Sequence, residues 1–198
     1  MKNKIVDNFL IVKNFINSEN AIKLSNEFKI YCQNNITQDD VQIPNTPAKY
    51  NYISFLELLC EKTPQVSEII GESVLPTYSY SRVYKNGDIL EKHTDRDACE
   101  ISLTLHLDGD KEWSIYVETP DNKEVEINLK QGDALLYLGC DAPHWRNAFE
   151  GQFYSQVFLH YVRSRGDKSY AYFDNKNKSI FSSYSIIKET KNIEHTYQ

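Results

Sequence analysis

Two side chains that can bind a metal ion lie two residues apart in the stretch LEKHTDRDACEIS, residues 90–102. His93 and Asp95 have the spacing that puts both side chains on one face of a β-strand, about 7 Å apart. An H-x-D pair is common, so on its own it fits surface residues as well as metal ligands. His144 follows after a QGD turn, in a second strand-like segment. Two histidines and one carboxylate can form the facial triad that binds Fe(II) and leaves coordination positions open.

The segments that must position these residues are short and strand-like from residue 76 onward. Six runs enriched in β-branched and aromatic residues are separated by turn sequences such as KNGD, TPDNKE and KQGD. Before them, two amphipathic helices are expected within residues 18–71, the first capped by Ser18 and the second interrupted at Pro64. This order predicts an α+β fold, with a sandwich or barrel of antiparallel strands and the helices packed on one sheet.

Alternation along two of the expected strands separates a polar face from an apolar one. In EISLTLHL, Ser102, Thr104 and His106 share one face, and in YSQVFLHY, Gln156 and His160 do the same. These polar faces fit either solvent or the wet interior of a small barrel whose apolar face turns outward against the helices. The interior is preferred if the candidate ligands line a cavity.

Composition limits the kind of protein. The 198 residues suit one domain, and 40% hydrophobic and 25% charged residues are typical of a soluble globular protein. The net charge of −6 disfavours a nucleic-acid partner, because phosphate binding needs a basic face. No apolar run is long enough to predict a membrane span. Four scattered cysteines without a C-x-x-C pair fit free thiols in a reducing cytoplasm, which is the expected location.

The strand pattern ends near residue 163, which sets the expected domain organisation. We predict one domain over residues 1–163, with helices within 18–71 and a strand core over about 76–163. Residues 164–198 are polar, rich in Ser, Asn, Lys and Tyr, and lack an apolar period. They predict an extension that either packs loosely on the domain or is partly disordered.

Three stretches together resemble a known family: RVYKNGDILEKHTDRDACEISLTLHL, KQGDALLYLG and PHWRNAFEGQFYSQVFLHYV. They are similar to the Fe(II)/2-oxoglutarate-dependent dioxygenases, which have a double-stranded β-helix (jelly-roll) core. The prolyl-hydroxylase-like branch is the most similar, because it has a tyrosine and a glycine ahead of H-x-D, as Tyr84 and Gly87 stand here. The resemblance covers about residues 76–163.

The resemblance implies an activity and a catalytic centre. His93, Asp95 and His144 would bind Fe(II), with 2-oxoglutarate and O₂ as cosubstrates and ascorbate as a stimulant. Such an enzyme converts 2-oxoglutarate to succinate and CO₂ while it hydroxylates an unactivated C–H bond. A peptide or protein side chain such as proline is the leading substrate class by this resemblance.

The distal carboxylate of 2-oxoglutarate needs a buried cation. Many relatives have an arginine or lysine about ten residues after the second histidine, but residues 152–156 contain neither. Arg146 comes two residues after that histidine, on the same strand face, and is the nearest candidate. Tyr84, His106 and Gln156 are the expected hydrogen-bond partners of the cosubstrate.

Several plainer interpretations remain open. Arg82 and Arg96 fit surface ion pairs, Trp113 fits core packing, and His106 and His160 fit inward histidines satisfied by neighbouring hydroxyls. Two other functions also compete with peptide hydroxylation: hydroxylation of a free amino acid or other small molecule, and a non-catalytic cupin-like module that binds a metal or ligand. Substrate identity and oligomeric state do not follow from the sequence.

Overall fold

The computed structural model describes residue 5 and residues 7–35 and 42–173. Two helices precede most of the strands: α1 (Ser18–Asn34) and α2 (Ile53–Ile70). The strands are β1 (Phe9–Val12), β2 (Ala48–Tyr50), β3 (Val74–Lys85), β4 (Leu90–His93), β5 (Ile101–Gly109), β6 (Ile115–Glu118), β7 (Glu124–Ile127), β8 (Ala134–Tyr137), β9 (His144–Arg146) and β10 (Phe153–Arg163).

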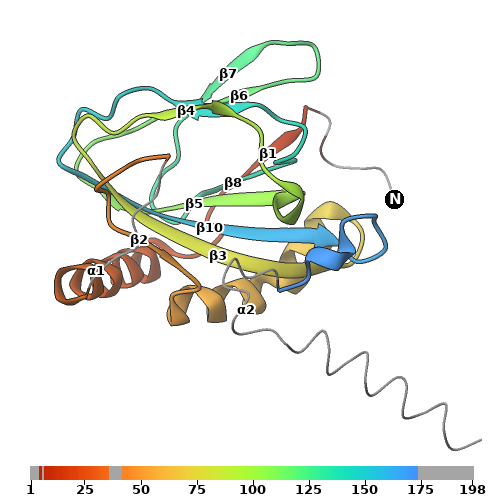
Figure 1. The fold of residues 1–198 in the computed structure, drawn as a ribbon, viewed down its shortest axis with the longest axis horizontal. Coiled ribbons are helices and arrows are strands. Elements are labelled where there is room, and N and C mark those ends of the chain that lie inside the picture. The colour runs from red at the N-terminus through yellow and green to blue at the C-terminus, as the bar shows by residue number, and fades with distance from the viewer. Residues whose placement is uncertain (1–4, 6, 36–41, 174–198) are drawn as a thin grey trace, which may run out of the picture.

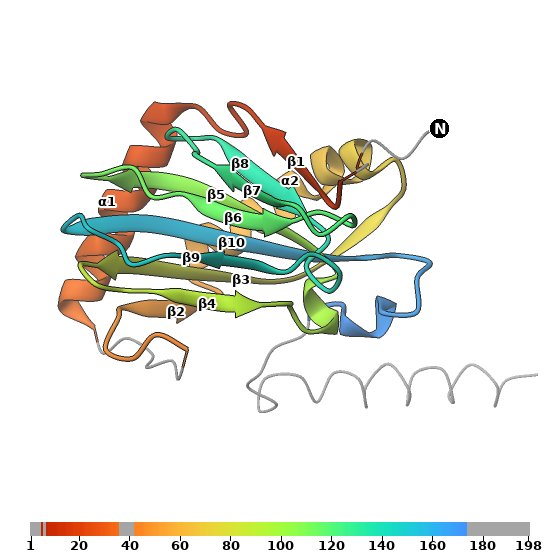
Figure 2. The same cartoon turned by 90° about the horizontal axis from the view of Figure 1, so that it is seen from above.

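The strands form two facing antiparallel sheets (Figure 1). The larger has the order β1-β8-β5-β10-β3-β2, and the smaller has the order β4-β9-β6-β7. Figures 1 and 2 show both helices on the outer side of the larger sheet, away from the smaller one. This arrangement confirms the predicted α+β jelly roll with helices packed on one sheet.

The apolar face of the larger sheet explains why the helices lie there. Leu103 and Leu105 of β5 and Leu159 of β10 are fully buried in one core cluster with Phe28 of α1 and Phe55 of α2. Alternate residues of the same strands point to the other side, toward the smaller sheet. The polar residues of β5 and β10 therefore face the interior between the sheets, as preferred from the sequence.

The second helix differs from the expectation, because α2 continues through Pro64. A proline in a helix leaves the carbonyl four residues earlier without its N–H donor. That carbonyl belongs to Cys60, which lies on the exposed side of the helix, where water can satisfy it. One residue earlier, Thr63 Oγ1 donates to the carbonyl of Leu59 at 2.9 Å, which supports the helix around the proline.

The N-cap of the first helix lies one residue earlier than predicted. Asn17, not Ser18, is the N-cap, and its side chain accepts a hydrogen bond from the backbone N–H of Asn20 at 2.7 Å. Asparagine and serine cap helices about equally well, so neighbouring candidates cannot be ranked by residue type.

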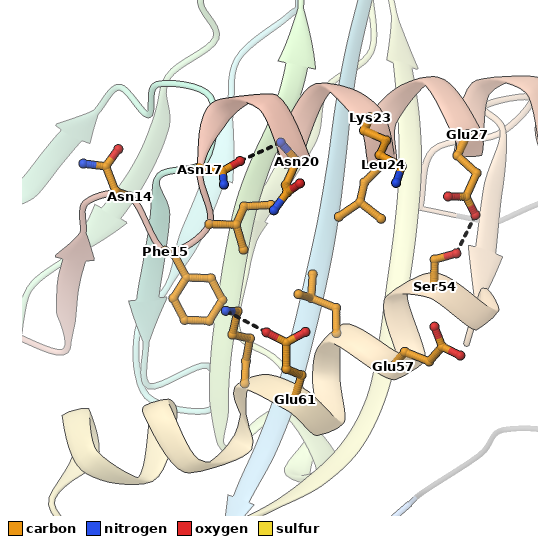
Figure 3. Close-up of a pocket in the computed structure, with 13 residues that line it drawn as sticks. Asn14, Phe15, Asn17, Asn20, Lys23, Leu24, Glu27, Ser54, Glu57 and Glu61 are labelled. Carbon is orange, nitrogen blue, oxygen red and sulfur yellow. Dashed lines mark hydrogen bonds and ion pairs between the residues drawn. The ribbon is translucent and has the colours of Figure 1, made fainter.

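A hollow of about 510 Å³ lies between the two helices, on the outer side of the larger sheet (Figure 3). Its wall carries Glu27, Glu57 and Glu61, and Ser54 donates a hydrogen bond to Glu27 across it. None of the three candidate metal ligands lines this hollow. The metal site predicted from the sequence therefore does not lie in this hollow.

The region after β10 is described only in part. Residues 169–171 form a short 3₁₀ turn, in which Ala171 is buried. Residues 174–198 lie outside the described part of the chain, so the predicted extension and the domain limits stay predictions. Within the described part, neither helix has the length and apolar character that crossing a membrane requires.

Candidate metal centre

The smaller sheet brings the three predicted metal ligands together. His93 ends β4, and it is the direct cross-strand partner of His144 at the start of β9. The H-x-D spacing had suggested that Asp95 lies in the same strand as His93. Instead, Asp95 lies in the loop after β4. Its backbone N–H donates to the carbonyl of Gly139 at 2.8 Å, which turns the carboxylate back toward the histidines.

One atom from each ligand residue points at a common position. Asp95 Oδ1 lies 3.7 Å from His93 Nε2 and 3.7 Å from His144 Nε2. Ligand bonds of about 2.0–2.2 Å from nitrogen and oxygen to a transition-metal ion can span such separations. The three residues thus offer the donor set of a facial triad.

Backbone carbonyls fix the tautomer of both histidines. His93 Nδ1 lies 2.7 Å from the carbonyl of Glu91, and His144 Nδ1 lies 3.0 Å from the carbonyl of Ala142. A carbonyl only accepts, so each Nδ1 carries the proton and each Nε2 presents its lone pair to the shared position. Burial also lowers the pKa of His144, although the charge of Asp95 opposes this, which favours the neutral ring that binds a metal.

The triad lies on the wall of a cavity of about 490 Å³ between the sheets. Aromatic residues form much of its lining. Arg82 also lines it and is 1% exposed, so the expectation of a surface ion pair is wrong for this residue. Its Nη2 donates to the hydroxyl of Tyr80 at 2.6 Å, and its guanidinium lies 5.5 Å from the ring centroid of Tyr84. Arg96 is exposed at the edge of the same cavity, where its guanidinium lies over the ring of Tyr78.

The residues predicted to bind 2-oxoglutarate divide into two groups. Tyr84 lines the cavity, whereas Arg146, His106 and Gln156 do not. Arg146 is buried, and its Nη2 donates to Gln156 Oε1 at 2.7 Å. Trp113 packs between this cluster and the cavity wall, because its ring lies 4.8 Å from the Tyr84 ring and 4.7 Å from the Arg146 guanidinium.

Two buried polar atoms in this cluster have no hydrogen-bond partner among the described residues: Arg146 Nε and His106 Nδ1. Unsatisfied groups of this kind are rare in native interiors and commonly mark a place for a ligand or a water molecule. Burial, helped by the charge of Arg146, lowers the pKa of His106 to about 4, so its ring is neutral at pH 7. A cation beside neutral polar groups fits a bound carboxylate.

Some cavity residues were missed at the sequence level. Tyr78, Tyr80 and Arg82 alternate along β3 on the same face as Tyr84 and line the cavity with it. Their i, i+2 spacing was a signal that could have placed them there. Tyr137 of β8, whose hydroxyl lies 3.4 Å from His144 Nε2, could not be found in this way, because its approach depends on how the two sheets face each other.

Comparison with known proteins bears on the fold. No protein-family model and no curated protein sequence match the chain. Among solved structures, a Pseudomonas putida prolyl-4-hydroxylase has a TM-score of 0.65 and 13% identity, covering 81% of this chain and 94% of its own. A Trichoplax adhaerens prolyl hydroxylase in complex with a peptide of hypoxia-inducible factor has a TM-score of 0.65 and 14% identity, covering 80% and 84%.

A third similar structure is that of an enzyme that catalyses a different reaction. The non-heme α-ketoglutarate-dependent epimerase SnoN, from nogalamycin biosynthesis, has a TM-score of 0.66 and 9% identity, and the match covers 80% of both chains. The chain therefore has the double-stranded β-helix fold of the Fe(II)/2-oxoglutarate oxygenases. At these identities the fold does not decide between hydroxylation and other oxidations.

Proposed function

We propose that the protein is an Fe(II)- and 2-oxoglutarate-dependent oxygenase that hydroxylates an unactivated C–H bond. The observation that carries the proposal is the convergence of His93 Nε2, His144 Nε2 and Asp95 Oδ1 on one position, in the fold that these oxygenases have. Iron bound there would couple the decarboxylation of 2-oxoglutarate by O₂ to oxidation of the substrate.

The chain's own residues would prepare this chemistry in three ways. The carbonyls of Glu91 and Ala142 hold the two histidines in the tautomer that binds a metal. Asp95 supplies the one negative charge among the ligands, which leaves a site with net positive charge for the anionic cosubstrate. The aromatic lining of the cavity would place apolar surface beside the reacting position.

We propose that Arg146 binds the distal carboxylate of 2-oxoglutarate, with Gln156, His106 and Tyr84 as its polar neighbours. Support comes from the unsatisfied Nε of Arg146 and from its place two residues after His144 on one strand face. Arg82 is the competing cation, because it lines the cavity directly.

The leading substrate class is a peptide or protein side chain such as proline, because two of the structures with this fold are prolyl hydroxylases. A free amino acid or another small molecule is the second candidate. The observation in its favour is the cavity volume of about 490 Å³, within the range of about 300–1,000 Å³ typical of small-molecule sites.

The deciding experiment measures succinate release by the full chain with Fe(II), ascorbate and 2-oxoglutarate, with and without substrates. Prolyl peptides and free amino acids are supplied in separate arms, and products are read by mass spectrometry as a gain of one oxygen atom. His93→Ala should abolish turnover, whereas Ser79→Ala, a buried change on the outer face of β3, should not. If wild type binds metal but releases no succinate in any arm, a non-catalytic binding module replaces this proposal.

Paired variants test the cosubstrate anchor. Loss of a hydrogen-bonded charge costs about 1.5–3 kcal/mol, so Arg146→Ala should raise the 2-oxoglutarate concentration for half-maximal succinate release by about 10- to 100-fold. Arg82→Ala should change it less. A larger rise in Arg82→Ala than in Arg146→Ala would overturn the assignment and make Arg82 the anchor.

A further inference from the structure

We propose that Ser102 and His160 are positioning residues that hold the Asp95 carboxylate so that it offers a single oxygen to the metal. This inference rests on the proposed function, because it requires a metal ion at the triad. It adds two residues, on two strands of the larger sheet, to a site whose ligands belong to the smaller sheet and the loop that follows β4.

The two oxygens of Asp95 have different surroundings. Oδ1 faces the two histidine Nε2 atoms, 3.7 Å from each. Oδ2 faces the other way and accepts a hydrogen bond from Ser102 Oγ at 2.7 Å. The backbone of Asp95 is also fixed, through its N–H bond to Gly139. With the main chain and one oxygen held, rotation of the carboxylate is restricted.

The number of protons available defines the direction of each hydrogen bond. The Ser102 hydroxyl has one proton, and around it lie Asp95 Oδ2 at 2.7 Å, His160 Nδ1 at 3.0 Å, the Cys99 carbonyl at 3.2 Å and the Tyr137 side chain. The charged oxygen is the nearest and the strongest acceptor, so it takes the proton. His160 Nδ1 must then donate to Ser102 Oγ. The chain of donors runs from His160 through Ser102 to Asp95.

Packing keeps this chain of hydrogen bonds in place. Ser102 of β5 and His160 of β10 are direct cross-strand partners, and both are buried. The ring of Tyr78 packs on His160 with 4.5 Å between centroids. A Cβ atom at Gly139 would lie 2.4 Å from Asp95 Oδ2 and 2.7 Å from Ser102 Oγ, so only glycine leaves room for the pair.

Ser102 also separates two possible metal positions. Donor atoms of Asp95, Cys99 and His160 lie within 4.8 Å of one another and form a second potential ligand set that shares Asp95 with the triad. The Ser102 hydroxyl lies between Asp95 and His160 and bonds to both. An ion in that second set would have to displace it, so the hydrogen bonds favour the His93 side of the carboxylate.

The consequence concerns the number of open coordination positions. A carboxylate that binds through both oxygens takes a position that a carboxylate bound through one oxygen leaves free. The facial triad needs three open positions for a bidentate cosubstrate and O₂. Ser102 and His160 would therefore protect one of them without touching the metal.

The test measures metal binding rather than turnover. Mn(II) affinity is titrated by electron paramagnetic resonance, and the Co(II)-substituted protein is compared by visible absorption. Ser102→Ala and His160→Leu should each weaken Mn(II) binding by about 10- to 100-fold, the usual effect of removing a partner of a metal ligand, and should change the Co(II) spectrum. Ser102→Thr and His160→Asn keep a donor in place and should restore most of the affinity.

Ser79→Ala is the matched control, because Ser79 is equally buried and its hydroxyl has no partner among the described residues. Its Mn(II) affinity and Co(II) spectrum should equal those of wild type. Wild-type affinity and spectrum in both Ser102→Ala and His160→Leu would overturn the inference and leave the proposed function standing. Failure of wild type to bind Mn(II) would instead remove the proposed function, and this inference with it. If circular dichroism shows that Ser102→Ala does not fold, His160→Leu decides.

Discussion

At the scale of single residues, four of the five histidines differ in the hydrogen-bond partner of their Nδ1 atom. In His93 and His144, Nδ1 donates to a carbonyl two residues earlier in the chain, which frees Nε2 for a metal. In His160, Nδ1 faces the Ser102 hydroxyl, and in His106 it has no partner among the described residues. The same side chain thus serves as a candidate ligand, a proposed positioning donor or a buried polar group, depending on the group that its Nδ1 faces.

His106 makes stability depend on pH. Burial, and after it the charge of Arg146, lowers the pKa of His106 to about 4, whereas histidine in the unfolded chain titrates near about 6.5. Between these values the unfolded chain binds more protons, so the free energy of unfolding falls as the pH drops from about 6.5 toward 4. Urea denaturation of the metal-free protein at several pH values should show this slope.

His106→Gln should reduce the slope over the same window. It should not remove it, because burial also lowers the pKa of His160 to about 4. Above about pH 6.5 the variant and wild type should have parallel profiles, since neither histidine then exchanges protons on unfolding. An undiminished slope in the variant would show that His106 is already protonated in the native state.

Residue types and spacing predicted part of this site. The triad could be proposed because His93 and Asp95 are close in sequence and His144 follows a recognisable turn. The bond from Ser102 to Asp95 could not, because Asp95 lies in a loop and its direction is set by the main-chain bond to Gly139. The interior position of Arg82 follows from alternation along β3, but its charge had favoured a surface position.

At the scale of elements, strand alternation was a sound guide and local helix signals were weaker. The polar faces of β5 and β10 point inward because the leucines on their other faces are covered by helices. Pro64 was expected to interrupt α2, yet the helix continues. Tertiary packing provides the reason, because Leu59 and Val66, on either side of the proline, are fully buried against the sheet.

Replacing Pro64 should therefore stabilise the protein. Pro64→Ala returns an N–H donor to the carbonyl of Cys60 and removes a residue that costs about 3 kcal/mol in a helix interior. The greater freedom of the unfolded chain offsets about 1 kcal/mol of this gain. We expect the free energy of unfolding in urea to rise by about 1–2 kcal/mol.

Glu68→Ala is the control for that measurement, because Glu68 is exposed one turn later in the same helix. Its effect should stay within about 0.5 kcal/mol, as for most surface substitutions. A loss of stability in Pro64→Ala would mean that the proline helps α2 to pack against the sheet. The helix would then owe its packing to the residue that weakens it locally.

At the scale of the whole molecule, the candidate centre joins the two sheets. His93 and His144 belong to the smaller sheet, whereas Asp95 is tied to the larger one through Ser102 of β5. Sequence alternation could assign faces within each strand but not the pairing of one sheet against the other. That pairing follows from strands far apart in the chain, such as β3 beside β10 in the larger sheet and β4 beside β9 in the smaller one.

Because the ligands converge only in the folded chain, a metal ion should stabilise the whole domain. At a free Mn(II) concentration 100 times its dissociation constant, the free energy of unfolding should rise by about 2.7 kcal/mol. For a chain of this size each kcal/mol raises the melting temperature by about 2–4 °C. Thermal unfolding followed by circular dichroism measures the shift, and a chelator should reverse it.

Asp95→Ala separates this effect from weak binding of Mn(II) at the acidic surface. Most acidic side chains remain in that variant, so a shift that depended on surface charge would persist, whereas a shift that depends on the triad would disappear. Equal shifts in Asp95→Ala and wild type would place the bound ion outside the cavity. A shift lost in Asp95→Ala and reduced in Ser102→Ala would show that the metal is coupled to both sheets through one carboxylate.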